Sequence, residues 1–154
     1  MTVYENNTGG QYAGYFVQEL REPADMGTQE FRELYSHFAK RILWMDGDAV
    51  PGAFQMNTAW YFAVPERDPI FTEHSHDCAE LLGFFGSDPD DPYELGGVIE
   101  FSVNGEARRL TRSTMIYLPG GFAHNPMRIL EVRAPIFHFS IVTDARYDGR
   151  ATYK

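Results

Sequence analysis

The chain has 154 residues, 44% hydrophobic and 23% charged, a balance typical of one soluble globular domain rather than a disordered segment. The formal net charge of -9 argues against nucleic acid or an anionic membrane surface as a partner. A single cysteine excludes an intrachain disulfide and favours a reducing, cytoplasmic location. We expect neither a signal peptide nor a membrane span, since no suitable apolar run is present.

The first 49 residues are predicted to form an extension with one helix. Residues 12–20 are a short strand candidate. Residues 27–43 are predicted to be helical, because their apolar side chains recur at spacings of three, four and seven and Thr28 is a suitable N-cap. The apolar stripe of this helix consists of Phe31, Leu34, Tyr35, Phe38 and Ile42.

Residues 50–143 contain six to eight short strand candidates separated by turn signals. Asn104-Gly105 favours the type I′ turn that joins two antiparallel strands, and Pro119-Gly120-Gly121 marks a second turn. This spacing predicts an all-β barrel or sandwich. Residues 144–154 are predicted to be a polar C-terminal tail.

Two histidines and an acid stand close together near the middle of the chain. His74 and His76 are two residues apart, so on a strand both imidazoles point to one face. Glu80 follows four residues later, and His124 comes directly after the Pro-Gly-Gly turn. Three imidazoles and a carboxylate suit Fe, Mn, Ni, Zn or Cu better than Ca or Mg. A solvated histidine pair is the alternative interpretation of the first two residues.

Both segments resemble the motifs of the cupin family. "HSHDCAE", with its glycine one position early at Gly86, is similar to H-x-H-x(3,4)-E-x(6)-G, and "PGGFAH" is similar to P-x-G-x(2)-H. The resemblance covers residues 50–143 and implies a double-stranded β-helix, the cupin or jelly-roll barrel, preceded by an N-terminal α-helix. It also implies one divalent transition metal ion (Fe, Mn, Ni or Zn) held by His74, His76, Glu80 and His124.

Several turn positions depart from the two motifs. Asp68 and Ser113 stand where the motifs begin with glycine, and Arg128 stands where the second motif has asparagine. The four ligand types are nevertheless all retained.

Other polar and aromatic residues are candidates for the surroundings of the metal. His138, between two phenylalanines, is either a satisfied core histidine or a catalytic acid-base, whereas His37 is expected to be solvated. Arg112 and Arg128 either hold a substrate carboxylate or are surface charges. The predicted pocket residues are Gln55, Asn57, Trp60, Phe84, Tyr117 and Arg128.

The resemblance implies several functions and does not choose among them. Our first hypothesis is a metal-dependent dioxygenase, decarboxylase or isomerase acting on a small chelating substrate such as a hydroxy acid, keto acid, diketone or aromatic compound. The second is a non-catalytic cupin that binds or senses a small ligand around a structural metal. We also expect a homodimer in which residues 12–20 add to the partner's sheet edge.

Overall fold

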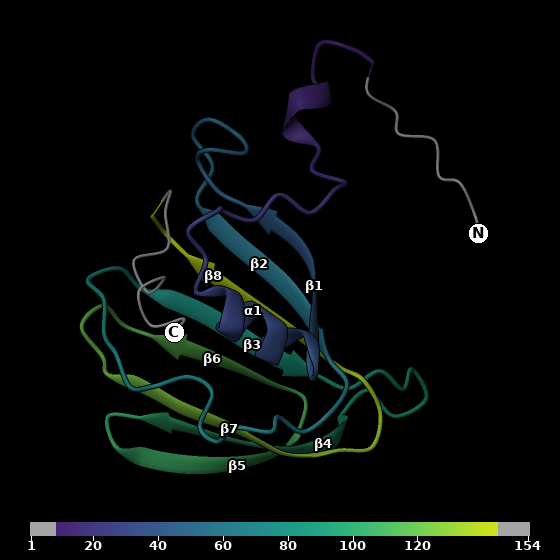
Figure 1. Ribbon diagram of the computed structural model, residues 1–154, viewed down its shortest axis with the longest axis vertical. Coiled ribbons are helices and arrows are strands. Elements are labelled where there is room, and N and C mark those ends of the chain that lie inside the picture. Colours follow the sequence, from purple (N-terminus) through teal and green to yellow (C-terminus); the bar gives the residue numbers. More distant parts are fainter. Residues whose placement is uncertain (1–8, 145–154) are drawn as a thin grey trace.

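The computed structural model describes residues 9–144, which form eight strands and two helices (Figure 1). None of the helices in this part of the chain is long and apolar enough to cross a membrane. The helices are the 3-10 helix η1 (Ala13–Tyr15) and α1 (Gln29–Ser36). The strands are β1 (Ala39–Met45), β2 (Gln55–Tyr61), β3 (Glu80–Phe85), β4 (Glu94–Val103), β5 (Glu106–Arg112), β6 (Thr114–Leu118), β7 (His124–Val132) and β8 (Ile136–Val142).

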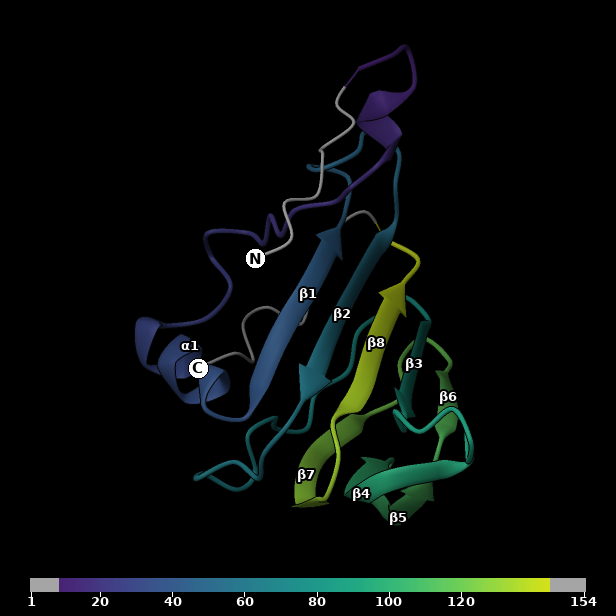
Figure 2. The same ribbon diagram turned by 90° about the vertical axis from the view of Figure 1, so that its right-hand side faces the viewer.

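The strands form two antiparallel sheets whose inner faces enclose the core. The larger sheet has the order β1-β2-β8-β3-β6, and the smaller has the order β5-β4-β7 (Figure 2). The chain crosses from one sheet to the other between β3 and β4, between β5 and β6, between β6 and β7, and between β7 and β8. This repeated crossing confirms the predicted all-β fold of the jelly-roll type.

Alternating burial along β2 shows which side chains face the interior. Gln55, Asn57, Ala59 and Tyr61 are buried, while the residues between them are partly exposed. Such a period of two is expected for a strand with one face on the core. Trp60 therefore faces away from the barrel interior, where its ring packs against Phe137 at 5.6 Å.

The predicted turn between β4 and β5 is confirmed. Asn104 has a φ of 46° and Gly105 a φ of 80°, so both central residues are in the left-handed region that a type I′ turn requires. The Asn104 side chain also accepts a hydrogen bond from the Ala123 amide at 2.9 Å. The turn is thereby tied to the loop that leads into β7.

The predicted helix is confirmed only in its first half. Thr28 caps α1 by accepting a hydrogen bond from the Phe31 amide at 3.1 Å, and Phe31 is buried. The helix ends at Ser36, and residues 39–43, predicted to be helical, lie in β1. Pairing with β2, interrupted by one irregularity between Arg41 and Leu43, outweighs the local helical preference of these residues. Strand β1 thus enters the sheet before residue 50, where the barrel was predicted to begin.

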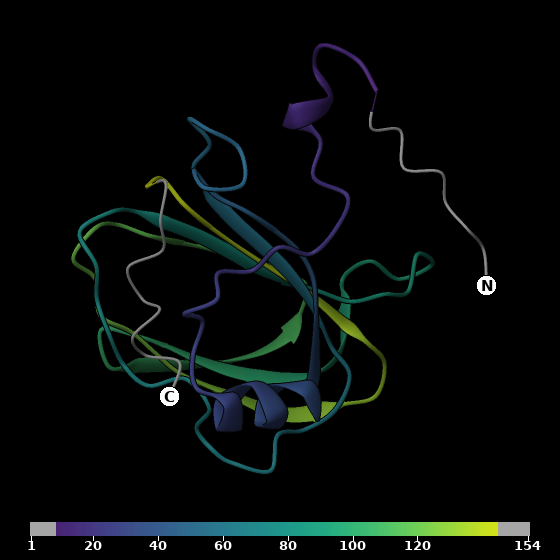
Figure 3. The same ribbon diagram turned by 45° about the horizontal axis from the view of Figure 1, so that its top comes forward.

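The predicted strand over residues 12–20 is wrong. This segment forms η1 and an irregular stretch that leads away from the two sheets (Figures 1 and 3). Its aromatic side chains are exposed, Phe16 by 71% and Tyr15 by 65%. An extended segment needs a neighbouring strand to satisfy its backbone, and the described residues pair none with it. The predicted C-terminal tail, residues 144–154, lies outside the described residues except for Asp144.

Candidate metal centre

A small cavity inside the barrel brings together side chains from distant parts of the chain. Its volume is about 50 Å³, enough for a few water-sized molecules. Both sheets and the loop before β3 contribute to its wall. Residues lining it include Arg41, Asn57, His74, Glu80, His124 and His138.

The two histidine segments are joined by backbone hydrogen bonds. The His74 amide donates to the His124 carbonyl at 3.0 Å, and the His124 amide donates to the His74 carbonyl at 2.9 Å. The Gly121 amide donates to the His76 carbonyl at 2.8 Å. His74 and His76 lie in a loop held by this isolated bridge rather than on a regular strand. The prediction that they lie close together is confirmed, although by a different backbone arrangement.

The Pro-Gly-Gly turn determines where His124 enters β7. A Cβ atom at Gly120 would lie 2.0 Å from the Asp77 carbonyl oxygen, so only glycine allows this close approach. The neighbouring Gly121 has a φ of 83°, a conformation that glycine adopts without strain. The turn therefore packs directly on the segment that carries His76.

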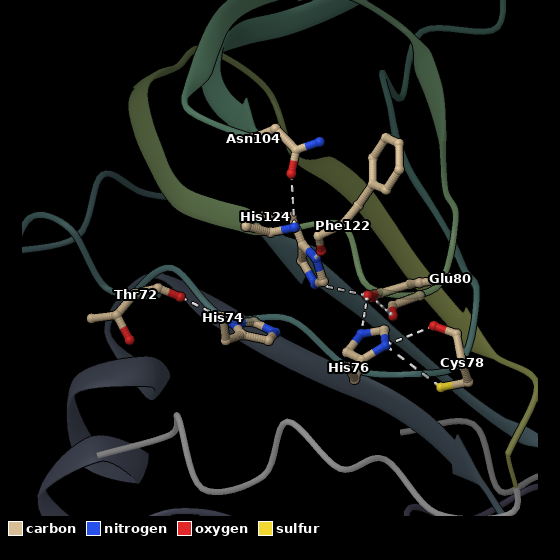
Figure 4. Close-up of polar contacts among 10 residues, drawn as sticks. Thr72, His74, His76, Cys78, Glu80, Asn104, Phe122 and His124 are labelled. Carbon is tan, nitrogen blue, oxygen red and sulfur yellow. Dashed lines mark hydrogen bonds and ion pairs between the residues drawn. The ribbon is translucent and has the colours of Figure 1, made fainter.

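Three imidazoles converge in this place (Figure 4). One ligand atom from each of His74, His76 and His124 lies within 4.8 Å of the other two. Each Nδ1 lies against a backbone carbonyl, at 3.0 Å from Thr72, 2.8 Å from Cys78 and 3.0 Å from Phe122, respectively. An Nδ1–H that donates to a carbonyl leaves Nε2 as the bare nitrogen. All three Nε2 lone pairs are thus available to one ion.

Glu80, the first residue of β3, adds a buried carboxylate. Its Oε2 lies 2.9 Å from His76 Nε2 and 3.1 Å from His124 Nε2 (Figure 4). Its Oε1 accepts a hydrogen bond from the Ser140 hydroxyl at 2.6 Å. Burial raises the pKa of Glu80, but hydrogen bonds from His124, His76 and Ser140 outweigh it and hold the pKa well below its usual range. The two imidazoles have this effect when Nε2 carries a proton, and a cation among the same atoms would take the place of those protons and favour the ionised carboxylate in the same way. The carboxylate is therefore ionised.

These donors fit a metal ion. The bare Nε2 atoms of His76 and His124 and the Glu80 oxygen are all acceptors, and acceptors at about 3 Å repel one another unless a cation lies among them. His124 Nε2 is buried and makes no hydrogen bond of good geometry with the described residues. Burial also lowers the pKa of His74, which keeps that imidazole neutral and able to coordinate. Three neutral imidazoles with one carboxylate suit a divalent transition metal.

His138 lies in the cavity wall without belonging to this cluster. Its ring is stacked between Tyr61 at 5.2 Å and Phe84 at 4.9 Å. Its Nδ1 donates to the Gly83 carbonyl at 2.9 Å, which leaves Nε2 as a hydrogen-bond acceptor. Burial lowers the pKa of His138 to about 4, so the ring is neutral at physiological pH. The ring thus packs against aromatic core side chains with its edge at the cavity, an arrangement compatible with both predicted roles.

The predicted pocket residues divide into two groups. Asn57 and Phe84 line the cavity, and Gln55 is fully buried on the inner face of β2 but does not line it. Three others do not line it. Trp60 faces outward because of strand alternation, Tyr117 is 66% exposed on β6, and Arg128 pairs with Glu100 at 3.0 Å and Asp68 at 3.2 Å.

Among the polar and aromatic residues of the cavity that sequence reasoning missed are Arg41, Tyr61 and Ser140. Arg41 falls within residues 27–43, which are predicted to be helical, and in β1 it instead lines the cavity. Tyr61 and Ser140 continue the inward faces of β2 and β8. The period of two in β2 and β8 is the signal from which the last two could have been found.

Comparison with known proteins gives the fold but no close relative. No protein-family model and no curated protein matches the chain. Its fold is similar to that of oxalate oxidase in complex with glycolate, with a TM-score of 0.51 and 11% identity over 91% of this chain. The match spans 63% of the oxalate oxidase chain.

Two bacterial structures are similar at lower scores. KdgF from Halomonas sp. has a TM-score of 0.42 and 17% identity, covering 71% of this chain and 79% of its own. An RmlC-like cupin from Shewanella frigidimarina has a TM-score of 0.41 and 14% identity, covering 71% of this chain and 78% of its own. The two-sheet topology, the meeting of both motif segments and the likeness to oxalate oxidase together show that this chain has a cupin fold.

Proposed function

We propose that this protein is a metal-dependent cupin enzyme that acts on a small chelating substrate. One observation carries the proposal. Three imidazoles and an ionised carboxylate turn their lone pairs toward one point in the barrel, at the edge of a cavity. The three backbone carbonyls that fix the imidazoles are the supporting contacts expected around a metal site.

His74, His76, Glu80 and His124 would hold the metal. Fe, Mn, Ni and Zn are the ions that this donor set favours. A bound ion of this kind supplies Lewis-acid polarisation of substrate oxygens, and iron adds reactivity toward dioxygen. The fold alone does not distinguish dioxygenase, decarboxylase and isomerase activity.

The cavity limits the substrate. A volume of about 50 Å³ accommodates a compound of a few heavy atoms beside the metal, such as a short hydroxy acid or keto acid. Larger diketones and aromatic compounds would need the wall residues to move. The neutral His138 ring offers an acceptor for a substrate hydroxyl, and Asn57 offers a polar contact.

Turnover by metal-loaded protein tests the proposal. Protein loaded separately with Fe(II), Mn, Ni or Zn would be incubated with hydroxy acids, keto acids, diketones and catechols. Oxygen consumption, carbon dioxide release and isomer formation would be measured during each incubation. We expect turnover that is lost in His76→Ala and kept in His37→Ala, a variant of an exposed histidine. Ligand binding without turnover would support the alternative of a non-catalytic cupin with a structural metal. If the metal-loaded protein showed no ligand binding and no turnover, both the enzyme proposal and the non-catalytic alternative would be contradicted.

A further inference from the structure

Arg41 brings a buried positive charge into the wall of the cavity. Only 7% of its side chain is exposed. Its guanidinium carbon lies 5.1 Å from the Tyr35 ring and 5.3 Å from the Trp44 ring, so aromatic side chains hold it in place. Burying a charge costs free energy unless an anion compensates it. Glu22 supplies one such anion to Arg41, and an anion in the cavity that Arg41 lines would be stabilised by the same charge.

The guanidinium is linked to the metal ligands through a row of polar groups. Arg41 Nη1 donates to the Asn57 side-chain oxygen at 3.2 Å. Asn57 is paired with Ser140 across β2 and β8, and the Ser140 hydroxyl donates to Glu80. Asn57 carries no charge and cannot neutralise Arg41. A small molecule in the cavity would thus lie among the cation, the amide and the metal site.

Glu22 supplies a carboxylate to Arg41 from outside the barrel. Its Oε2 lies 2.8 Å from Arg41 Nε, and 40% of its side chain is exposed. The following turn is anchored, since Arg32 donates to the Ala24 carbonyl at 2.7 Å and Met26 is 4% exposed. Glu22 can therefore leave Arg41 without any change in the core.

The charges of the cavity favour an anionic ligand in spite of the protein's overall net charge of -9. A divalent metal with three neutral imidazoles and one carboxylate keeps a positive net charge, and Arg41 adds to it. Glu22 removes part of this excess at the outer side of Arg41. A substrate carboxylate would supply the same kind of group that Glu22 supplies.

We propose that Arg41 binds the carboxylate of a small carboxylic acid substrate, and that Glu22 competes with the substrate for Arg41. Arg41 is then the residue that selects acids over neutral compounds of the same shape. This inference rests on the proposed function, because it assigns the substrate class of the same metal-containing cavity.

Binding of a matched pair of probes to Co(II)-loaded protein tests the inference without requiring turnover. The probes are glycolate and glycolamide, which share two oxygen donors and differ in charge. Changes in the visible Co(II) absorption report binding to the metal, and elemental analysis reports cobalt content separately. We expect glycolate to bind at least 10-fold more tightly than glycolamide.

Three variants separate the roles of Arg41 and Glu22. Arg41→Gln should weaken glycolate binding about 10- to 100-fold, with little effect on glycolamide or cobalt content, because it removes charge-assisted hydrogen bonds. Arg112→Gln, at an exposed arginine stacked on Tyr93, should bind like the wild type. Glu22→Gln keeps Arg41 in place and should tighten glycolate binding about 2- to 5-fold, the effect of a partly exposed ion pair. Glu30→Gln is its matched control.

The outcomes distinguish this inference from the proposed function. Failure of the wild type to bind cobalt would overturn the proposed function and this inference with it. Cobalt binding with equal affinity for the two probes would overturn the inference alone and leave the metal centre intact. If a folded, cobalt-loaded Arg41→Gln protein kept the preference for glycolate over glycolamide, the glycolate carboxylate would have to bind to a group other than Arg41. Unchanged or weaker glycolate binding in Glu22→Gln would contradict the proposal that Glu22 competes with the substrate for Arg41.

Discussion

Each imidazole of the candidate metal centre is oriented by a backbone carbonyl two residues away along the chain. Thr72 and Phe122 serve His74 and His124 from the N-terminal side, and Cys78 serves His76 from the C-terminal side. The carboxylate, in contrast, depends on a side chain from β8. This makes Glu80 the ligand whose orientation can be altered by a single remote substitution.

Ser140→Ala is predicted to weaken metal binding about 10- to 100-fold, because the Glu80 oxygen loses its hydroxyl donor. Titration against a chelator of known affinity measures the change. Ser102→Ala, at a buried serine on β4, is the matched control. Equal metal affinity in the Ser140 variant and the wild type would show that the hydroxyl does not position the carboxylate.

His138 is predicted to make the metal-free protein less stable in mild acid. Its pKa in the folded protein is about 4, against the ordinary value of 6.5 in the unfolded chain, so between these values the unfolded state binds more protons. Stability is therefore unaffected above about pH 6.5 and falls as the pH drops toward 4, by roughly 2 to 4 kcal/mol. Thermal melts at pH 7 and pH 5 should show a smaller decrease for His138→Gln. A decrease of the same size in both proteins would contradict this assignment.

At the scale of elements, the site is built where two loops meet rather than on one strand. The loop before β3 carries His74 and His76, and the Pro119–Gly121 turn carries the chain into β7 at His124. Backbone hydrogen bonds connect the two loops. A change in the turn should consequently reach the metal without touching a ligand.

Gly120→Ala is predicted to reduce both stability and metal affinity, since the added Cβ would meet the Asp77 carbonyl oxygen at 2.0 Å. Backbone on both sides must then separate, at a cost of about 1 to 3 kcal/mol. Denaturant unfolding and a metal titration measure the two effects. Gly14→Ala, where a Cβ meets no atom within 4 Å, should behave like the wild type. Normal metal affinity in Gly120→Ala would mean that the turn does not place His124.

Sequence reasoning worked where a local pattern has a fixed structural meaning. The Asn104-Gly105 turn and the spacing of the two histidine motifs needed no information about distant contacts. It failed where pairing partners decided the structure. Residues 39–43 satisfy a helical pattern but pair with β2. Because they were predicted to be helical, Arg41 was not predicted to line the cavity. Residues 12–20 satisfy a strand pattern but have no paired strand among the described residues.

At the scale of the whole molecule, two of the groups of exposed large apolar side chains lie around η1 and on β6. Tyr12, Tyr15 and Phe16 are exposed around η1, and Met115 and Tyr117 are each 66% exposed on β6, an edge strand. Apolar side chains gathered in this way favour association. The homodimer stays a prediction, although a strand formed by residues 12–20 no longer supports it.

Light scattering during size-exclusion chromatography is predicted to give a mass twice the 17.6 kDa of the chain. Phe16→Ser should shift the population toward monomer if η1 takes part in the contact. A wild-type mass of one chain over the whole micromolar range would contradict the dimer.

Metal content tests the central claim most directly. The protein would be purified without a tag, oxygen or chelator and examined by elemental analysis beside His76→Ala and His37→Ala. We predict about one equivalent of Fe, Mn, Ni or Zn per chain in the wild type and in His37→Ala, and loss of most of it in His76→Ala. Absence of metal from the wild type, together with failure to take up any of these ions from solution, would contradict the metal centre and the enzyme proposal built on it.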